Sequence, residues 1–470
     1  MTIRARRATL ADSGLILEWR NHESSRKYST NNRVIKKVEH EKWYQNRIKQ
    51  IDDQSFWIFG NETSQFGYVR FDRSIDSKNT FEISICINPE FQNKGHGKEF
   101  LAKSVFLHFE KHPTSKIIAR VSRNNSASLS LFTKANFIEK ISLDDFIVLE
   151  LFNRNLRFVF RADATKKIGT GHTQRSLGLI QELKDLGYEV IFVGDTSEIT
   201  WVTLQLKSLG FSNIFSKEQD FTSNPKTDIL ILDTYTIPTN SEFINKLNWL
   251  LVVVIHDLHT PEYYADVIIH PGVSENIVVK KDVKLLSGPK YVLLRKSIKR
   301  LQVESKSSNL VITVVGGGVD KIGFACEMSK HLKLIPGEFI VNFFSADALS
   351  IDSDLRFQTF EFSDKLDEIG NQSDLIFCTS SSTSLEFIAR GCAVGIVCGS
   401  FNQQQYYRIL PKLGVAEAIG VYQDDKWVMD LKVIQNLISS KSLRDELSKK
   451  SLELIDFDGA KRVVNEIMSH

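Results

Sequence analysis

The pattern of hydrophobic and polar positions changes once along the chain, near residue 155. Before that point, short runs alternate apolar with polar residues, as strands with one buried face do. These runs cover residues 55–59, 67–71 and 81–87, and residues 98–111 then show helical spacing. We therefore predict an α+β domain over residues 1–152, with successive antiparallel strands.

Beyond residue 156 the apolar runs are nearly continuous and alternate with amphipathic helical segments. They cover residues 156–160, 190–193, 229–232, 250–255, 310–315, 339–344, 375–378 and 394–397. Strands that are apolar on both faces indicate a parallel sheet covered by helices on each side. Because a polar, serine-rich segment at residues 296–309 divides the series, we expect two Rossmann-like lobes, residues 156–300 and 305–470, with a cleft between them.

The hydrophobic pattern predicts an α/β multidomain fold, and the length and composition are those of a globular protein with several domains. Of 470 residues, 42% are hydrophobic and 25% are charged, and the net charge of +3 gives no field that would recruit nucleic acid, so we expect no nucleic-acid partner. No export signal and no apolar run of about 18 residues is present, which predicts a cytoplasmic protein without a membrane span. The five cysteines lack C-x-x-C spacing, so we expect reduced thiols and no metal.

A glycine-containing turn follows the third predicted strand. That strand alternates its apolar residues with Glu82, Ser84 and Cys86, which places Glu82 on a face turned toward a cleft. The chain then runs through Gln92-Asn93-Lys94-Gly95-His96-Gly97-Lys98 into a helix. Converging backbone N–H groups and the helix dipole at such a turn would bind a pyrophosphate without a metal.

The order of these elements is specific. A strand is followed by the pattern Q-x-x-G-x-G and a helix, and the pattern N-x5-L-F-x4-F comes later, from Asn125 to Phe137. The pattern resembles the GCN5-related N-acetyltransferase (GNAT) superfamily across residues 1–151. The resemblance implies acetyl-CoA as co-substrate and Glu82, or an ordered water, as the base that takes the amine proton; a solvated surface carboxylate is the alternative role for Glu82. The implied acetyl-CoA-binding residues are Ile87, Gln92, Asn93, Lys94, Gly95, His96, Gly97, Lys98 and Asn125.

Two further segments, residues 19–21 (W-R-N) and 40–43 (H-E-K-W), resemble the subset of this superfamily that acetylates an amino group on nucleotide-linked sugars. Acetylation of protein N-termini is the open alternative, since one scaffold serves both acceptors. The chain departs from the family at Phe132, where a tyrosine usually protonates the CoA thiolate, and at Asn136, where glycine is usual. The proton donor is therefore left unidentified.

A second polar constellation falls at the carboxyl ends of the predicted parallel strands, where ligands of open α/β sheets bind. The first such strand ends at Asp163, and the turn Ile168-Gly169-Thr170-Gly171-His172-Thr173-Gln174-Arg175 leads into a helix. Other polar residues at the same edge are Asp233, Tyr235, His256 and Asp257, then residues 316–318, residues 379–386, Asn402 and Gln403. Helix capping and loop hydrogen bonding are the alternative roles for His172 and for the aspartates.

These elements, with G-P-K-Y-V-L-L-R at residues 288–295 and G-G-G-x-D at residues 316–320, resemble the UDP-sugar hydrolases of pseudaminic acid biosynthesis. Those proteins are two-lobed relatives of inverting GT-B glycosyltransferases, and the resemblance runs from about residue 156 to residue 470. It implies that water cleaves UDP-2,4-diacetamido-2,4,6-trideoxy-β-L-altropyranose, that His172 orients or deprotonates this water, and that Glu386 binds the ribose hydroxyls. The implied catalytic residues are His172 and Asp163, and the implied UDP-sugar-binding residues are Gly169, Gly171, Arg175, Tyr235, Asp257, Gly317, Gly318, Ser382, Thr383, Glu386, Asn402 and Gln403.

The two halves together predict a bifunctional enzyme whose partners are acetyl-CoA and a UDP-linked amino sugar. The first domain would acetylate the 4-amino group, and the second would release the product from UDP. A GT-B glycosyltransferase that passes the sugar to an acceptor is the main alternative. A non-catalytic nucleotide-sugar binding protein is another, because Ser380 and Ser381 stand where the family usually has glycine.

Overall fold

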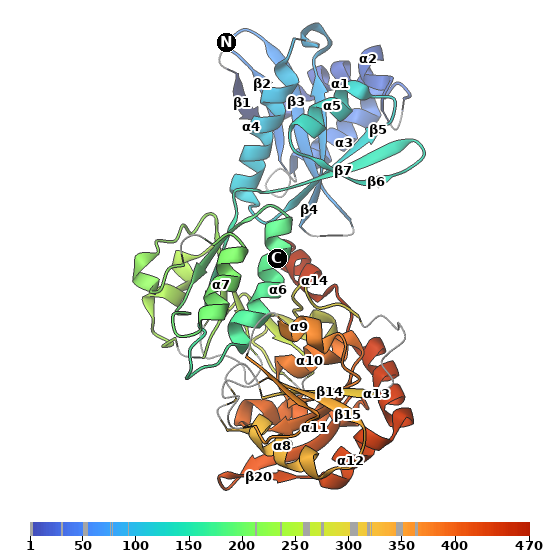
Figure 1. The fold of residues 1–470 in the computed structure, drawn as a ribbon. Coiled ribbons are helices and arrows are strands. Elements are labelled where there is room, and N and C mark those ends of the chain that lie inside the picture. The colour runs from blue at the N-terminus through green and yellow to red at the C-terminus, as the bar shows by residue number, and fades with distance from the viewer. Residues whose placement is uncertain are drawn as a thin grey trace. The chain divides into compact units, whose positions relative to one another are not determined.

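The computed structural model describes the chain except for residues 1–2, 30–31, 50–54, 76, 78, 93, 212–213, 236, 257–263, 274–276, 301–308, 317–319, 321, 345–350 and 362–364. Two units are present, Met1–Leu156 with Glu466–His470, and Arg157–Asn465. The ribbon in Figure 1 gives the element labels used below. Among the described residues, none of the helices is both long and apolar enough to cross a membrane.

The first unit is built on a seven-stranded sheet of order β1-β2-β3-β4-β5-β7-β6. The predicted antiparallel succession of strands is confirmed, because β2 pairs antiparallel with β3 and β3 with β4. The strands are β1 (Arg4–Arg7), β2 (Phe56–Gly60), β3 (Gln65–Arg73), β4 (Thr80–Ile87), β5 (Lys116–Ser122), β6 (Ile138–Ser142) and β7 (Phe146–Phe152).

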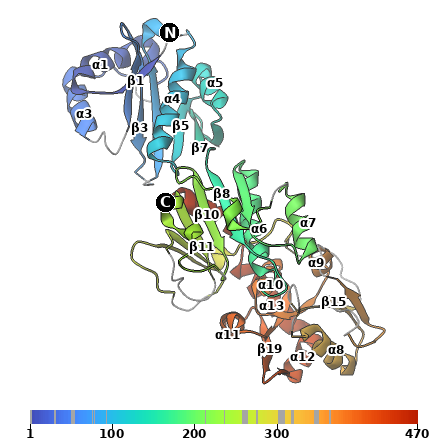
Figure 2. The same ribbon diagram turned by 90° about the vertical axis from the view of Figure 1, so that its left-hand side faces the viewer.

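Helices cover both faces of this sheet. Figure 2 shows α4 and α5 on one face and α1 and α3 on the other. Each face has its own apolar core, centred on Phe100 and Leu101 beneath α4 and on Trp19 and Tyr44 beneath α1 and α3. The helices are α1 (Ser13–Asn21), α2 (Glu23–Arg26), α3 (Lys37–Lys49), α4 (His96–Lys111) and α5 (Ser126–Lys134).

Strands β4 and β5 separate after a short parallel pairing. Their register covers only Thr80 to Glu82 on β4 and Lys116 to Ile118 on β5, although β4 continues to Ile87 and β5 to Ser122. Past Glu82, the β4 edge that faces β5 therefore has backbone donors and acceptors that this ladder does not use. The opening leads directly to the glycine turn before α4.

A buried histidine in this unit makes its stability depend on pH. His108 on α4 is fully buried, stacks on Phe71 at 4.2 Å between ring centroids and shares a 2.9 Å hydrogen bond through Nε2 with Ser115. Burial, with smaller contributions from nearby cations, lowers the pKa of His108 from its ordinary 6.5 to about 3. Below pH 6.5 this histidine is therefore protonated in the unfolded chain but stays neutral in the folded chain. The free energy of unfolding falls as the pH drops below 6.5.

We predict that this unit loses roughly 1.5 kcal/mol of stability through His108 between pH 6.5 and pH 5. The change His108→Gln should flatten that part of the curve of unfolding free energy against pH, which urea denaturation measures. An equally steep curve in the variant would contradict the assignment. The solvent-facing histidine change His22→Gln serves as the control.

The second unit contains two sheets, and the first is fully parallel. Its strand order is β13-β12-β11-β10-β8-β9. Strand β9 therefore lies on one side of β8, and β10 to β13 follow on the other side. Helices α6 (Gly171–Asp185) and α7 (Thr200–Ser208) belong to this lobe. Its strands are β8 (Arg157–Ala162), β9 (Glu189–Val193), β10 (Asp228–Asp233), β11 (Leu251–Ile255), β12 (Val267–Pro271) and β13 (Lys284–Gly288).

The second sheet has the order β16-β15-β14-β17-β18-β19-β20 and is parallel except for its last strand, β20. The strands are β14 (Leu310–Val315), β15 (Phe339–Phe344), β16 (Phe357–Phe360), β17 (Leu375–Thr379), β18 (Ala393–Cys398), β19 (Glu417–Gln423) and β20 (Lys426–Met429). The helices are α8 (Phe324–Leu334), α9 (Lys365–Gly370), α10 (Ser382–Arg390), α11 (Gln404–Lys412), α12 (Leu431–Ser439), α13 (Lys441–Leu454) and α14 (Gly459–Met468).

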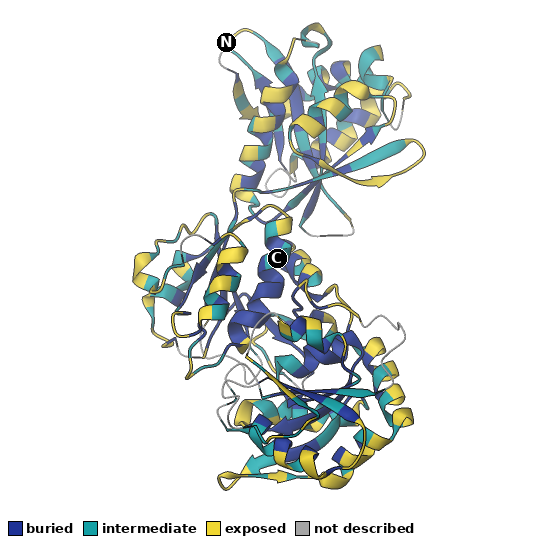
Figure 3. Cartoon of the chain, viewed as in Figure 1, coloured by how far each residue is buried: buried dark blue, intermediate teal, exposed yellow. Residues whose placement is uncertain are grey.

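Both predicted parallel sheets are confirmed, and their central strands are drawn in the buried colour in Figure 3. One connection was not predicted: the start of α14 returns to the first lobe. Arg462 donates through Nη1 to the carbonyl of Lys290 at 2.7 Å, and a Cβ at Gly459 would lie 2.0 Å from the Val292 carbonyl oxygen. Glycine is therefore required where α14 meets residues 290–292.

Candidate functional site

A cavity of about 740 Å³ lies in the second unit, at the carboxyl ends of its parallel strands. The first lobe lines it with residues 168–172, with Tyr235 and with α7, and the second lobe with residues around the start of α10. This is the edge at which open α/β sheets bind ligands. It is also where the sequence places the second polar constellation.

His172 is held in one orientation by a buried aspartate. It lies in the first turn of α6, lines the cavity, and its Nδ1 is 2.6 Å from Oδ1 of Asp233, the last residue of β10. When Nδ1–H donates to a carboxylate, Nε2 is left as the proton acceptor. His172 does not occupy the N-cap position of α6, since the helix begins at Gly171 and its N-cap residue is Thr170.

Asp233 remains ionised because cations and a hydroxyl surround it. Arg175 donates to it through Nε at 2.8 Å and through Nη2 at 2.5 Å, and Ser176 donates through Oγ at 3.1 Å. Burial opposes ionisation, but the charges of Arg175 and His172 outweigh it and hold the pKa of Asp233 below its ordinary value. An anion here would stabilise the imidazolium that forms when His172 takes a proton.

Tyr235 and His256 complete the surroundings of His172. The Tyr235 ring meets His172 edge-on at 4.4 Å and His256 edge-on at 5.5 Å. Burial, with the positive charge of Arg175 next, lowers the pKa of His256 to about 4, so His256 is a neutral neighbour at physiological pH. Asp257, which the sequence assigned to the same edge, lies outside the described residues.

Asp163, which the sequence predicts as a catalytic residue, is not among the residues that line the cavity. Its carboxylate pairs with Arg161 at 2.7 Å and accepts the backbone N–H of Asp195 at 3.0 Å. Its backbone carbonyl accepts from Thr173 at 3.1 Å. These contacts tie β8 to the loop after β9 and to α6, so Asp163 holds the turn that carries His172.

In the second lobe, α10 presents its N-terminus to the cavity. Ser382 and Thr383 form its first turn, whose backbone N–H groups have no carbonyl partner within the helix and are suited to a phosphate. A Cβ on Gly171 would lie 3.7 Å from Ser382 Oγ, so the two glycine- and serine-containing turns face each other.

Two serines replace the expected glycines without strain. The Ser380 hydroxyl lies 3.0 Å from the carbonyl oxygens of Val397 and Gln403, which fixes the loop after β17. Ser381 has an extended backbone with φ of −133°, so this position does not need glycine.

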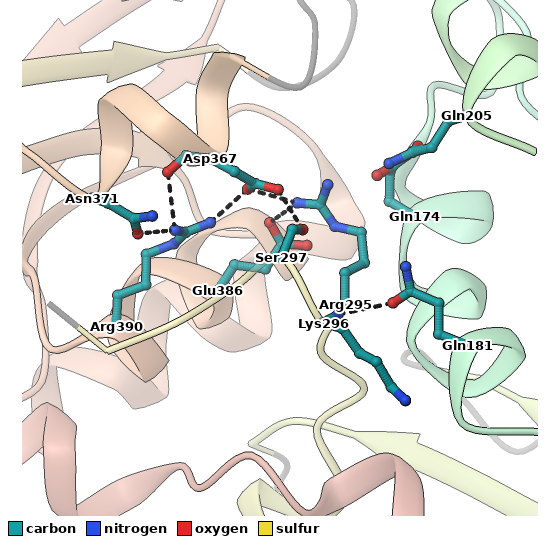
Figure 4. A network of polar contacts seen from close by, with 10 residues as sticks. All are labelled: Gln174, Gln181, Gln205, Arg295, Lys296, Ser297, Asp367, Asn371, Glu386 and Arg390. Carbon is teal, nitrogen blue, oxygen red and sulfur yellow. Dashed lines mark hydrogen bonds and ion pairs between the residues drawn. The ribbon is translucent and has the colours of Figure 1, made fainter. Parts of the chain in front are cut away.

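Glu386, one turn into α10, is part of a buried ionic network (Figure 4). Arg295 donates to Glu386 at 2.9 Å and lies 3.3 Å from Asp367, and Arg390 donates to Asp367 at 2.5 Å. Two cations and two carboxylates balance in charge, and these contacts hold Glu386 at the cavity wall. The predicted ribose contact of Glu386 is compatible with this placement.

The remaining predicted UDP-sugar residues divide between described and undescribed positions. Gly169, in the left-handed region with φ of +91°, Asn402 and Gln403 line the cavity. Gly317 and Gly318 lie outside the described residues. Gly316 is needed beside them, because a Cβ there would lie 2.2 Å from Asp320, whose carboxylate accepts the N–H groups of Phe324 and Ala325 and caps α8.

In the first unit, the predicted pyrophosphate turn leads directly into α4. Gly95 takes a left-handed conformation with φ of +83°, and α4 begins at His96. Gly97 is closely packed, since a Cβ there would lie 3.1 Å from Cδ1 of Ile87. The Gln92 amide donates to the carbonyl of Ile87 at 3.3 Å, while Lys94 stacks over Phe91 at 5.0 Å.

His96 stacks on Phe66 at 5.1 Å, and Lys98 follows in the first turn of α4. Asn93 lies outside the described residues. Asn125 caps α5, its Oδ1 accepting the Ser128 N–H at 3.0 Å. Any contact of Asn125 with acetyl-CoA would therefore use its amide nitrogen.

Glu82 lies at the last paired position before β4 and β5 separate. Its carboxylate is 3.7 Å from Arg120 on β5, and its side chain is 38% exposed. A base at this point would reach an amine bound in the opening between the strands.

The two departures from the family pattern have structural explanations. Phe132 is buried and packs edge-on against Phe137 at 4.9 Å, so this position serves the core. Asn136 adopts φ of +66°, the left-handed conformation in which asparagine substitutes for glycine at a helix end.

Sequence reasoning placed Asp233 at the ligand edge, since it ends a buried strand, but did not predict its pairing with His172. Other residues of the cavity escaped sequence reasoning. Gln205 and Trp201 on α7 carry no motif, and only the tertiary structure brings them to the cavity. Within the part of the chain that is described, no group of three or more His, Cys, Asp or Glu side chains could hold a metal ion.

Residues 2–138 match the family described as acetyltransferase (GNAT) domain. The UDP-2,4-diacetamido-2,4,6-trideoxy-beta-L-altropyranose hydrolase of Campylobacter jejuni is 21% identical over 187 residues. That match covers 38% of this chain and 66%, just under two thirds, of the hydrolase.

Two solved structures match parts of the chain. Spermidine N-acetyltransferase from Vibrio cholerae, in complex with CoA and spermine, is 18% identical to the matched part, with a TM-score of 0.30. The match covers 32% of this chain and 95% of the acetyltransferase chain. MurG from Acinetobacter baumannii is 15% identical to the matched part, with a TM-score of 0.47. The match covers 67% of this chain and 100% of the MurG chain.

The predicted fold class is confirmed. The mixed sheet of the first unit coincides with the family match, and the second unit has the two expected parallel sheets. The protein is an α/β multidomain chain that carries an acetyltransferase (GNAT) domain at its N-terminus.

Proposed function

We propose that this chain catalyses two consecutive steps on one nucleotide-linked amino sugar. The first unit would use acetyl-CoA to acetylate the 4-amino group of UDP-4-amino-4,6-dideoxy-N-acetyl-β-L-altrosamine. The second unit would then hydrolyse the product, UDP-2,4-diacetamido-2,4,6-trideoxy-β-L-altropyranose, to free sugar and UDP. The relative from Campylobacter jejuni supports the second step by its name, over part of its length.

For acetyl transfer, the neutral amine attacks the thioester carbonyl, and CoA leaves as a thiolate. The turn at residues 92–98 would hold the pyrophosphate through backbone N–H groups, and the opening beside β4 would admit the thioester arm. Glu82 would accept the proton that the amine nitrogen loses. Each residue of the turn is thus assigned to binding and Glu82 to proton transfer.

For hydrolysis, Nε2 of His172 would take a proton from water as its oxygen attacks the anomeric carbon. The bond between that carbon and the β-phosphate oxygen breaks, and UDP leaves with its charge facing the N-terminus of α10. Asp233 and Arg175 would hold His172 in the required tautomer. UDP needs no proton to leave, so no second acidic group is required.

One observation carries this proposal. His172, which Asp233 orients, lines the same cavity as the start of α10 and Glu386. The proposed base, diphosphate site and ribose site would therefore share one cavity of about 740 Å³, a volume large enough for a sugar nucleotide.

Hydrolysis in ¹⁸O-labelled water tests the reaction and distinguishes it from transfer. We expect free sugar without any added acceptor, label in the sugar, and UDP without label, because the carbon–oxygen bond breaks. Label in UDP would show attack on phosphorus, and strict dependence on an added acceptor would favour a glycosyltransferase. Either result would contradict the proposed step.

The change Glu82→Gln is predicted to lower the acetylation rate by about 100-fold, because glutamine cannot accept the amine proton. CoA release in the presence of the amino sugar is the measurement. The binding of acetyl-CoA should change little, since Glu82 is not assigned to it. Glu139→Gln, on the exposed strand β6, is the control, and equal rates for the two variants would remove Glu82 from proton transfer.

A further inference from the structure

The face of the first sheet on which α1 and α3 lie carries an arginine close to Glu82 (Figure 2). Arg70 on β3 is directly opposite Ser84 on β4, and Asp72 is directly opposite Glu82. Residues opposite each other in a ladder point to the same face, and Arg70 stacks over Trp43 of α3 at 5.0 Å. Arg70 therefore shares the face of Glu82 and lies two residues further along β4, beside the opening between β4 and β5.

Arg120 on β5 lies on the other side of this opening. Glu82 is opposite Ile118 at the last position of the short β4–β5 ladder, and Arg120 follows two residues later, so it points to the same face. Its guanidinium is 3.7 Å from the Glu82 carboxylate, and its side chain is 48% exposed. Arg70 and Arg120 thus lie on the two strands that flank β4, each about 7 Å along the sheet from the level of Glu82.

Positive charge exceeds negative charge around these two arginines. Asp72 pairs with Arg47 at 2.8 Å and with Arg70 at 3.1 Å. The side chain of Arg47 is 6% exposed and that of Arg70 is 25% exposed, so Arg70 is the one that a ligand can reach. Together with Arg120 and Glu82, the group has three arginines and two carboxylates, and its net charge is positive.

A fourth arginine approaches the same part of β4 from α1. Burial raises the pKa of the Cys86 thiol, and a contact with Ser25 at 3.8 Å and the charge of Arg20 both oppose that rise. Cys86 follows Ser84 on this face of β4, so Arg20 adds positive charge on the side nearer the acetyl-CoA turn. This charge favours an anionic acetyl acceptor over a polyamine.

We propose that Arg70 and Arg120 bind the diphosphate of the acetyl acceptor while its amine lies at Glu82. In a sugar that reacts at its 4-amino group, the phosphate is attached at the anomeric carbon, on the opposite side of the ring. The length of such a ring matches the rise of two residues along a strand, about 7 Å, which separates Glu82 from the level of the two arginines. Guanidinium groups donate pairs of parallel hydrogen bonds to phosphate oxygens. The inference rests on the proposed function, since it takes the acceptor to be a nucleotide-linked amino sugar.

Two acceptors offered to the full chain test this role: the UDP-linked 4-amino sugar and the same amino sugar without UDP. From CoA release, we expect kcat/KM of the wild-type chain to be at least about 100-fold higher for the UDP-linked acceptor. Arg70→Gln should raise KM for that acceptor about 10-fold and leave the rate with the free sugar within about twofold. Arg4→Gln, the same change on the edge strand β1, should keep the wild-type KM, because the Arg4 side chain is 71% exposed and far along the strand order from β4.

Arg70→Lys and Arg120→Gln provide further variants, in case Arg70→Gln does not fold. Lysine keeps the charge but loses the paired hydrogen bonds, so Arg70→Lys should raise KM less than Arg70→Gln does. Arg120→Gln should also raise KM for the UDP-linked acceptor. Wild-type KM values in the folded Arg70 and Arg120 variants would overturn the diphosphate role. So would a lower kcat with both acceptors at unchanged KM, which would assign these arginines to proton transfer at Glu82.

The proposed acetylation is scored separately by CoA release from the wild-type chain. No CoA release with the UDP-linked amino sugar would overturn this inference and the acetylation step together. CoA release at equal rates with the UDP-linked and the free amino sugar would overturn this inference alone.

Discussion

Replacing His172 by alanine is expected to reduce UDP release by about a thousandfold, while UDP still binds. The loss follows from removing the proton acceptor, since general-base catalysis contributes about 10²–10⁴-fold. The variant keeps Asp233 paired with Arg175 and Ser176, so the cavity should retain its shape. Initial rates of UDP release and UDP titration measure the two effects.

The control is His331→Ala, on α8 and paired with Glu327 outside the cavity, which should release UDP at the wild-type rate. Asp233→Asn provides a finer test, because it preserves volume but removes the charge that stabilises the imidazolium. It should cost less than the loss of His172 itself. Wild-type rates in His172→Ala would remove the base from the proposed reaction.

The second large effect is expected at the pyrophosphate turn. Gly95→Val should raise the KM for acetyl-CoA by about 10- to 100-fold, because a β-branched residue at φ of +83° strains the backbone by about 1–3 kcal/mol. The strain either displaces the loop amides or is released by unfolding them. Steady-state kinetics with varied acetyl-CoA measures the change.

Gly95→Asn is the matched control, since asparagine tolerates the left-handed region. Its KM should remain within about threefold of the wild-type value, because no atom lies within 4 Å of the added Cβ. Equal KM values for the valine and wild-type chains would show that the loop amides do not hold the cofactor.

The sheets of this protein were predictable because their strands carry the signal locally. Continuous apolar runs such as residues 310–315 and 339–344 coincide with β14 and β15. Exposed strands escaped detection, and β6, exposed at every position, has no apolar face to mark it. Strand β20 pairs antiparallel at the sheet edge, a feature that no local pattern encodes.

The candidate site was predictable only in part, because side-chain pairing is not a local property. The turn carrying His172 follows a motif, whereas its partner Asp233 lies 61 residues away. Asp163 was placed at the same edge as the end of a predicted strand, but its pairing with Arg161 could not be predicted from that position. Arg295 belonged to a recognised motif, but its contacts with Asp367 and Glu386 depend on the packing of the second lobe.

The two-step account is tested most directly by incubating the intact chain with the UDP-linked 4-amino sugar and following CoA, UDP and sugar by mass spectrometry. With acetyl-CoA present, we predict equal amounts of CoA and UDP and a diacetamido sugar as the free product. Without acetyl-CoA, UDP release should be far slower. Rapid UDP release without acetyl-CoA, or CoA release without any UDP, would contradict the account.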